Sequence, residues 1–191
     1  MGDLFDPTGN RLYLNAAERA EFLSAAAKCD REVRSFCELL HFTGCRLSEA
    51  LALTTRRIDF DEKTIIVETL KKRREGVFRA VPVPDRLLDT LDLVHGVHEA
   101  QKRNTDRNLW QWSRVTAWRK VKAVMYKAGI DDGPHASPKG LRHSYGVTAI
   151  SSGVPLNMLS KWMGHSKIET TAIYANALGQ EQRDIAARMW E

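Results

Sequence analysis

The chain has 191 residues, 43% of them hydrophobic, so it is long enough to bury one sizeable core and too short for two full-sized domains. Lys and Arg total 29 against 24 Asp and Glu, a net charge of +5 that permits a polyanionic partner and equally fits an ordinary solvated surface. No stretch is apolar enough to cross a bilayer, and the N-terminus lacks the basic and apolar regions of a signal peptide, which argues against membrane and secreted classes.

The first part of the chain predicts three helices after a short lead-in. Residues 1–15 carry turn-forming and polar residues and predict the lead-in. Alanines predict a helix over 16–28, and the next apolar residues recur at helical spacing as far as Gly44. A third helix is expected from about Leu47, so Arg46 lies at a loop–helix junction, a place that suits an exposed functional cation.

Three cysteines fall in this region, at positions 29, 37 and 45. They form no CxxC pair, and no histidine stands at metal-ligand spacing, so no metal site is predicted. Residues eight apart share one helix face, where cysteine packs as a small apolar residue. This usage predicts a reduced, cytoplasmic chain.

One β region follows the helices. Strands are expected at 57–60, 64–70 and 77–83, which predicts a small antiparallel sheet of three strands. The second and third strands are joined by residues 71–76, a polar turn whose glycine suits a hairpin. Its four successive cations project past the sheet edge: Lys71, Lys72, Arg73 and Arg74.

The middle of the chain predicts two further helices. Apolar spacing over 87–94 indicates the first, while residues 96–108 lack a strong period and predict a loop or a frayed helix end. Residues 113–128 predict the second, with an apolar stripe that includes Trp118, which is therefore expected in the core and not as a base-stacking platform. Five basic residues lie off the stripe: Arg114, Arg119, Lys120, Lys122 and Lys127.

The last third predicts a series of helices with polar residues at their ends. Ser137 and Pro138 mark a helix start, which places Arg142 early in that helix. A shorter helix should close at Gly164, directly before His165. Tyr174 falls on the helix after that.

These cations and the tyrosine suit phosphoryl transfer to a phenolic oxygen. Such a reaction needs a nucleophile, positive charge for the non-bridging oxygens and a proton donor for the leaving oxygen. Arg46 and Arg142 can clamp phosphate oxygens without changing protonation state. Tyr174 has an ordinary pKa near 10 and needs nearby cations or a base before it attacks. Each residue alone is an ordinary helix or surface residue.

Together, three sequence boxes resemble the active-site signature of the tyrosine recombinases, the phage-integrase family. The boxes are Thr43-Gly44-Cys45-Arg46-Leu47-Ser48-Glu49-Ala50, then Lys139-Gly-Leu-Arg142-His143, then Gly164-His165 with Tyr174 nine residues later. The resemblance covers about residues 16–177. It implies an α+β fold, mainly α-helical, in which residues 16–191 form a catalytic domain with a small three-stranded antiparallel sheet. Residues 178–191 resemble the C-terminal helix that relatives pass to a neighbouring subunit.

The resemblance also assigns roles to residues. It implies that Tyr174 attacks the scissile phosphate to give a 3'-phosphotyrosyl bond and a free 5'-hydroxyl, while His165 hydrogen-bonds the phosphate. A hairpin lysine acts as general acid; Lys71 is the first choice and Lys72 the second. Lys139 stands where the family usually has histidine, so its proton role stays open. Two neighbours are expected to serve these groups: Glu49 orients the first arginine, and His143 is structural.

The implied function is site-specific recombination of double-stranded DNA by a homo-oligomer, from dimer to tetramer, without metal or cofactor. The expected backbone-binding residues are Lys72, Arg73, Arg74, Arg114, Arg119, Lys120 and Lys122. Relatives carry an N-terminal DNA-clamping domain that this sequence lacks, so the chain is either complete or an excised catalytic domain. Two alternatives remain: a DNA-binding regulator or decoy with this fold, and a type IB topoisomerase-like enzyme. The target site and the outcome of recombination are not predicted.

Overall fold

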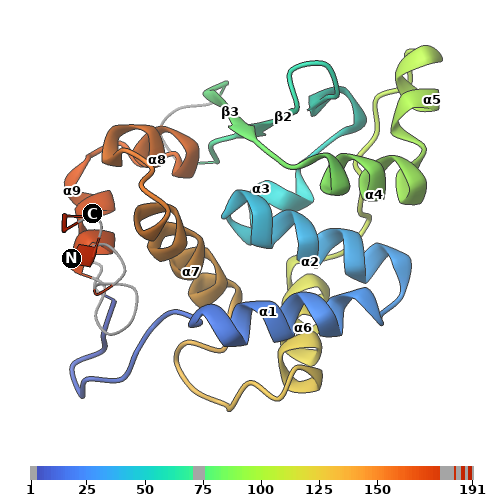
Figure 1. The fold of residues 1–191 in the computed structure, drawn as a ribbon. Coiled ribbons are helices and arrows are strands. Elements are labelled where there is room, and N and C mark those ends of the chain that lie inside the picture. Colours follow the sequence, from blue (N-terminus) through green and yellow to red (C-terminus); the bar gives the residue numbers. More distant parts are fainter. Residues whose placement is uncertain (1–3, 71–75, 177–182, 184–185, 188, 191) are drawn as a thin grey trace.

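The computed structural model describes residues 4–70, 76–176, 183, 186–187 and 189–190. Its α-helices are α1 Ala16–Ala27, α2 Arg31–Thr43, α3 Leu47–Leu51, α4 Asp85–His95, α5 Val97–Lys102, α6 Arg114–Lys127, α7 Pro138–Ser151, α8 Leu156–Met163 and α9 Glu169–Ala172. The strands are β1 Ile58–Asp59, β2 Thr64–Glu68 and β3 Phe78–Pro82, with 3-10 turns η1 Thr55–Arg57 and η2 Ile173–Asn176. The predicted class, a mainly helical α+β fold with a small sheet, is confirmed (Figure 1).

The sheet is antiparallel in the order β1-β2-β3, as predicted. β2 and β3 pair in a register that sets Ile65 opposite Val81 and Val67 opposite Arg79. Alternate side chains face opposite sides of a strand, and these four point to the buried side. The core-facing side of β3 therefore carries a charge, Arg79.

The main core is formed by α1, α2, α4, α6 and the buried face of the sheet. Phe22, Phe36, Ile65, Leu87 and Val121 represent these elements, and all five are fully buried. Hydrophobic burial at helical and strand spacing thus explains why the sequence pattern located most elements correctly.

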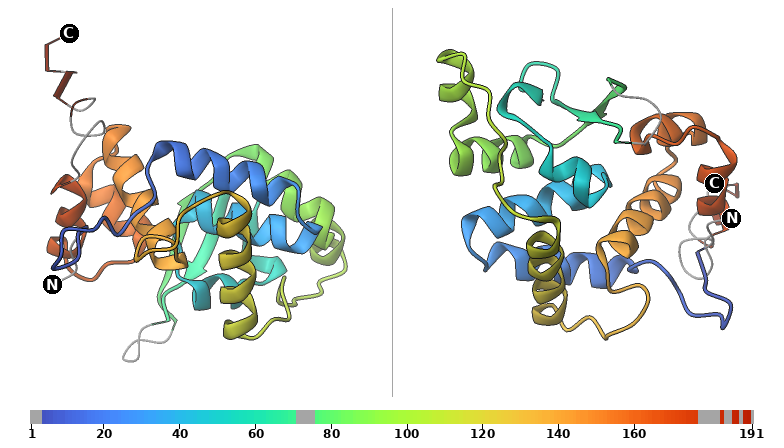
Figure 2. Two further views of the ribbon diagram at one scale, coloured as in Figure 1. Left: turned by 90° about the horizontal axis from the view of Figure 1, so that it is seen from below. Right: turned by 180° about the vertical axis from the view of Figure 1, so that it is seen from behind.

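A second apolar cluster lies where α7 and α8 meet η2, on the side of the molecule where the N-terminal segment also lies (Figures 1 and 2). The lead-in contributes to it through Leu4 and Tyr13, both buried. The backbone N–H of Leu14 also donates to Ser144 Oγ, 2.6 Å away on α7. The lead-in therefore packs against α7, which carries Lys139 and Arg142.

Several local predictions differ from the structure. Residues 97–102 form α5, because Gly96 adopts a left-handed conformation that ends α4 and the next residues restart a helix with Val97 and Ala100 buried. Trp118 is not in the core: it is 45% exposed, since the buried stripe of α6 runs through its neighbours Ala117 and Val121.

Two more details differ. Tyr174 lies on the 3-10 turn η2, not on the α-helix before it. The cysteines do not share one helix face, because only Cys37 lies in a helix; Cys45 follows α2 and is buried, and Cys29 is partly buried between α1 and α2. All three still pack against the main core as small apolar residues. Among the described helices, none is long and apolar enough to cross a membrane.

Candidate active site

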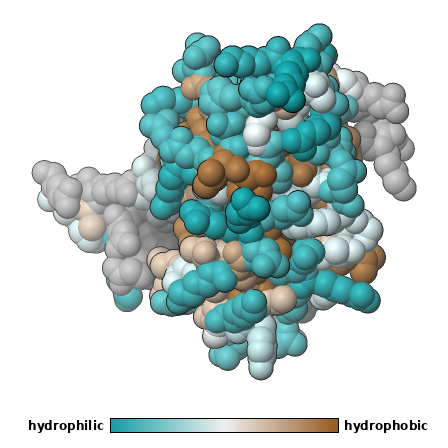
Figure 3. All heavy atoms as spheres, turned by 90° about the vertical axis from the view of Figure 1, so that its right-hand side faces the viewer, coloured by the Kyte–Doolittle hydropathy of each residue, from teal (hydrophilic) through white to brown (hydrophobic). Residues whose placement is uncertain are grey.

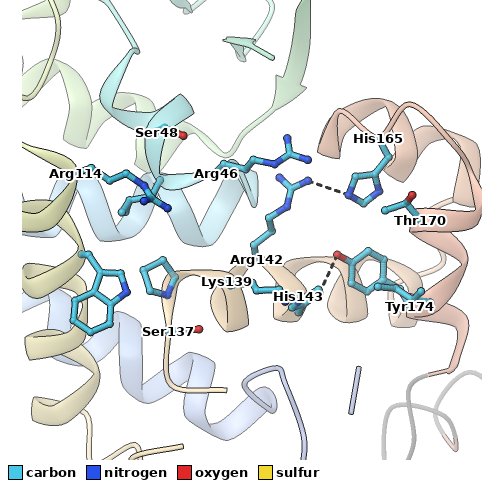
Figure 4. Close-up of a pocket in the computed structure, with 14 residues that line it drawn as sticks. Arg46, Ser48, Arg114, Ser137, Lys139, Arg142, His143, His165, Thr170 and Tyr174 are labelled. Carbon is cyan, nitrogen blue, oxygen red and sulfur yellow. Dashed lines mark hydrogen bonds between the residues drawn. The ribbon is translucent and has the colours of Figure 1, made fainter. Parts of the chain in front are cut away.

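A pocket of about 500 Å³ lies where α3, α6, α7 and η2 converge (Figure 4). Five of the predicted catalytic residues line it, although they come from distant parts of the chain: Arg46, Lys139, Arg142, His165 and Tyr174. Figure 4 shows the side chains of Arg46 and Arg142 next to each other, with His165 beside them. Folding therefore concentrates two guanidinium groups and a phenol in one concave site.

Arg46 is positioned by the turn between α2 and α3. Gly44 ends α2 with φ of 57°, a left-handed conformation that favours glycine. A Cβ at this position would also lie 2.5 Å from the Tyr145 ring, so only glycine fits. Arg46 is the N-cap of α3, where Glu49 accepts from its backbone N–H at 2.9 Å and from Nη1 at 2.7 Å.

Glu49 joins Arg46 to a second arginine. Its side chain is 1% exposed, and its Oε2 accepts from Nη2 of Arg79 on β3, 2.7 Å away. Arg79 also donates from Nε to the carbonyl of Trp162 in α8, at 2.7 Å. Burial alone would raise the pKa of Glu49, but Arg79 and then Arg46 hold the pKa below its ordinary value. An ionised, buried carboxylate therefore fixes α3, β3 and α8 around the pocket.

Arg142 is held at the bottom of the pocket by three contacts. Nη1 donates to the carbonyl of Gly44 at 2.6 Å, and Nη2 donates to the carbonyl of Met163 at 2.7 Å and to His165 Nε2 at 3.0 Å. Burial, and then the charge of Arg46, lower the pKa of Arg142 to about 10, so it stays charged at neutral pH. Two of its five N–H groups donate to no partner among the described residues, so they can donate to a ligand.

His165 adopts a defined tautomer. Arginine has no acceptor, so Nε2 of His165 must accept from Arg142, and the ring proton sits on Nδ1. Nδ1 lies 2.8 Å from Thr171 Oγ1 and donates to it. The imidazole ring stacks on the ring of Tyr174 at 6.4 Å with an interplanar angle of 13°. His165 therefore links Arg142 to the segment that carries the tyrosine.

Tyr174 is 1% exposed and packs against α7. Its hydroxyl Oη lies 3.3 Å from Nδ1 of His143 (Figure 4). Burial raises the pKa of Tyr174 to about 12, although Arg142 and Arg46 act in the opposite direction. The phenol is therefore protonated at neutral pH, and it must lose that proton to become a nucleophile.

Gly146 makes room for the tyrosine ring. A Cβ on this α7 residue would lie 2.5 Å from ring atoms of Tyr174. Gly146→Ala adds helix propensity worth about 0.5–1 kcal/mol, but overpacking of this kind costs about 1–3 kcal/mol. We expect a net fall in the thermal unfolding midpoint. Thr148→Ala, on the exposed side of the same helix, should leave the midpoint equal or higher; a Gly146→Ala protein as stable as wild type would show that the ring moves freely.

The other predicted residues lie in different surroundings. Lys71, Lys72, Arg73 and Arg74 lie outside the described residues. Lys139 is exposed in the first turn of α7. Arg114 lines the pocket from the first turn of α6, next to the exposed face of Trp118.

The remaining basic residues of α6 lie outside the pocket lining. Arg119 is exposed. The ammonium Nζ of Lys120 lies over the ring of Trp112, 4.8 Å from the ring centroid, in a cation–π contact. Lys122 is bound to the loop before α7, through Asp132 at 2.7 Å and the carbonyl of Ala136 at 2.9 Å. Arg114 is therefore the cation of α6 best placed to act with the site.

Sequence reasoning missed three residues of the site. Arg79 was not singled out, yet strand alternation puts it on the inward face, and an inward arginine requires a buried acid. His143 was expected to be structural, but it contacts Tyr174. Gly146 offers no pattern of its own, because its role depends on a ring that approaches from another element.

Comparisons with known proteins give a consistent result. The model of the phage integrase family matches residues 13–181. The tyrosine recombinase XerD of Mycobacterium leprae is 30% identical over 166 residues, which cover 81% of this chain and 51% of the relative. XerA of Pyrococcus furiosus is 27% identical over 159 residues, covering 78% and 52%. The chain thus spans about half the length of the curated relatives it matches.

Solved structures share the fold. The crystal structure of the XerA recombinase matches with a TM-score of 0.78 at 22% identity, covering 96% of this chain and 66% of that one. The XerH recombinase bound to its difH substrate matches at 0.70 and 18%, covering 98% and 60%. The catalytic domain of bacteriophage HP1 integrase matches at 0.64 and 20%, covering 92% and 93%.

Proposed function

The chain belongs to the phage integrase family, and from this premise we propose that its pocket cuts and rejoins DNA strands at specific sites. The observation that carries the proposal is the set Arg46, Arg142, His165 and Tyr174 around one pocket. Two fixed guanidinium groups can neutralise the non-bridging oxygens of a phosphate while the phenolic oxygen attacks the phosphorus.

The proposed reaction transfers one DNA strand to Tyr174 and releases a 5'-hydroxyl. Tyr174 Oη gives up its proton to a nearby base and forms a bond to phosphorus. The bond from phosphorus to the 5'-oxygen breaks, and a 3'-phosphotyrosyl link results. The leaving oxygen takes a proton from a lysine, either Lys139 at the pocket or the hairpin lysine, Lys71 or Lys72. The phosphodiester energy is kept in the new link, so a second 5'-hydroxyl can reverse the step without metal or nucleotide.

Double-stranded DNA is the proposed partner. The Tn1549 transposon integrase is seen in complex with transposon right end DNA, and this chain shares that fold. Arg114 and Trp118 extend the lining of the pocket beyond the catalytic cations, where a strand flanking the scissile phosphate would pass. Basic groups there and on the hairpin would bind backbone phosphates in a salt-dependent way.

Assembly on DNA as a dimer to tetramer is also proposed. Met189 and Trp190 are 79% and 77% exposed, so the end of the chain offers apolar side chains that a second subunit could cover. Covalently trapped complexes, resolved by mass after crosslinking, would show whether more than one subunit occupies a paired site.

Covalent trapping tests the proposed function. The protein is incubated with a pool of randomised duplexes, each nicked so that the short cleaved end diffuses away, and DNA that stays attached after denaturation is sequenced. A recombinase should enrich one sequence and join two copies of it. Binding without any adduct would favour a regulator, and relaxation of any supercoiled plasmid without paired products would favour a topoisomerase.

Arg114→Ala is expected to weaken DNA binding about equally for all sequences. Loss of one phosphate contact should reduce the slope of log affinity against log salt by about 0.9. The measurement is a titration of fluorescent duplex at several salt concentrations. Arg103→Ala is the matched control, because Arg103 is exposed and paired with Glu99 at the end of α5. That side of the molecule is mostly hydrophilic (Figure 3). Equal salt slopes for the two variants would contradict a role for Arg114.

A further inference from the structure

His143 is the residue next to the tyrosine hydroxyl. Its Nδ1 lies 3.3 Å from Tyr174 Oη, and both side chains are buried (Figure 4). The two rings are tilted at 54° with centroids 5.8 Å apart, so they do not stack. The contact is therefore a polar one between the imidazole edge and the reacting oxygen.

The surroundings determine the charge of this imidazole. Two charged groups on its own helix act on His143, Lys139 and Arg142. Arg46 from the start of α3 and the imidazole of His165 line the same pocket. Burial, then Lys139 and Arg142, lower the pKa of His143 to about 4. The imidazole is therefore neutral at neutral pH. In the tautomer with its proton on Nε2, the protonated phenol donates to Nδ1.

The other ring nitrogen then carries the proton. Nε2 of His143 is buried and has no hydrogen-bond partner among the described residues. A buried polar group without a partner costs free energy, and such groups are retained where they have a chemical role. A histidine that only filled space could be replaced by an apolar residue without this cost.

Resting on the function proposed above, we propose that His143 is a catalytic residue, the proton acceptor for Tyr174. As the Oη–phosphorus bond forms, the phenolic proton passes to Nδ1, and the imidazole becomes an imidazolium with both nitrogens protonated. In the reverse step the proton returns to Oη as the phosphotyrosyl bond breaks. The charge balance supports this, because an entering phosphate places negative charge beside the cations that now disfavour the imidazolium.

His143→Asn tests the proton transfer and keeps the hydrogen bond. The amide oxygen of asparagine can stand where Nδ1 stands and accept from Tyr174, but it does not take a proton at working pH. General-base catalysis contributes about 10²–10⁴-fold, so we expect single-turnover cleavage of the selected nicked DNA to slow at least 100-fold. The proton must then go to solvent, so the rate should rise about tenfold per pH unit near neutrality, whereas the wild-type rate stays nearly flat.

A second substrate locates the defect. With sulfur in place of the 5'-bridging oxygen, the leaving group needs no proton. Cleavage of this DNA should therefore be restored in a variant that lacks the lysine acid, but not in His143→Asn.

NMR of the free protein tests the hydrogen bond itself. The ¹⁵N signals of wild type should show His143 as the Nε2–H tautomer at pH 7, and these signals should change in Tyr174→Phe. Circular dichroism and the unfolding midpoint of His143→Asn should match wild type.

The outcomes separate this inference from the proposed function. If wild type forms no adduct with any DNA, the recombinase proposal fails and this inference fails with it. If wild type reacts and His143→Asn cleaves at the same rate with the same flat pH profile, only the inference is overturned. Rescue of His143→Asn by the sulfur-containing DNA would also overturn it, because the residue would then act on the leaving group.

Discussion

Tyr174→Phe is expected to abolish the covalent protein–DNA adduct completely while leaving DNA binding unchanged. The substitution removes one oxygen from a ring that is 1% exposed, and the packing of that ring against α7 is retained. Without Oη no other group takes the same position, since the hydroxyl is the atom that lies beside His143 Nδ1 in the pocket. The measurement is the fraction of labelled nicked DNA that stays attached to protein after denaturation.

Tyr126→Phe is the matched control for this experiment. It makes the same chemical change on α6, where Tyr126 is 85% exposed, and should form as much adduct as wild type. An adduct that persists in Tyr174→Phe would mean that another residue attacks DNA, and the role proposed for Tyr174 would be wrong. Loss of DNA binding as well as adduct would point to misfolding.

Glu49→Gln is expected to cause the largest loss of stability among single changes at the site. Glu49 and Arg79 form a buried pair, with side chains 1% and 4% exposed. Removal of one charge from a buried pair leaves the other uncompensated and costs about 3–5 kcal/mol. Urea unfolding should therefore show a clearly lower midpoint with an unchanged slope. Glu99→Gln breaks an exposed pair with Arg103 and should change stability by about 0.5 kcal/mol or less.

The effect of Glu49 should depend on pH in a defined direction. The arginines hold its folded pKa below the ordinary value, so its ionisation stabilises the folded state above the unfolded pKa, near 4.3. Wild type loses this contribution as pH falls below about 5, and the difference between wild type and Glu49→Gln should shrink. A difference that grows in acid, or none at neutral pH, would contradict the buried ion pair.

Much of the fold was predictable because it depends on short-range patterns. The apolar spacing of α2 and α4, Ser137 as the N-cap of α7, and Gly164 as the end of α8 all express local rules of helix formation. The pairing of β2 with β3 followed from strand-forming residues on either side of a polar turn that contains a glycine. Prediction failed at α5 and η2, which are short and carry a weak period.

By itself, the sequence predicted the class of chemistry and four residues that the structure places around one pocket: Arg46, Arg142, His165 and Tyr174. Their boxes are local in the chain and could be read without distances. Only the tertiary structure decided which groups contact this set and its neighbours. Arg79 donates to Glu49, His143 contacts the Tyr174 hydroxyl, and Gly146 leaves room for the Tyr174 ring. The physical reason is that these contacts join residues from different elements, where close packing and the need to compensate buried charge, not spacing along the chain, fix the partner.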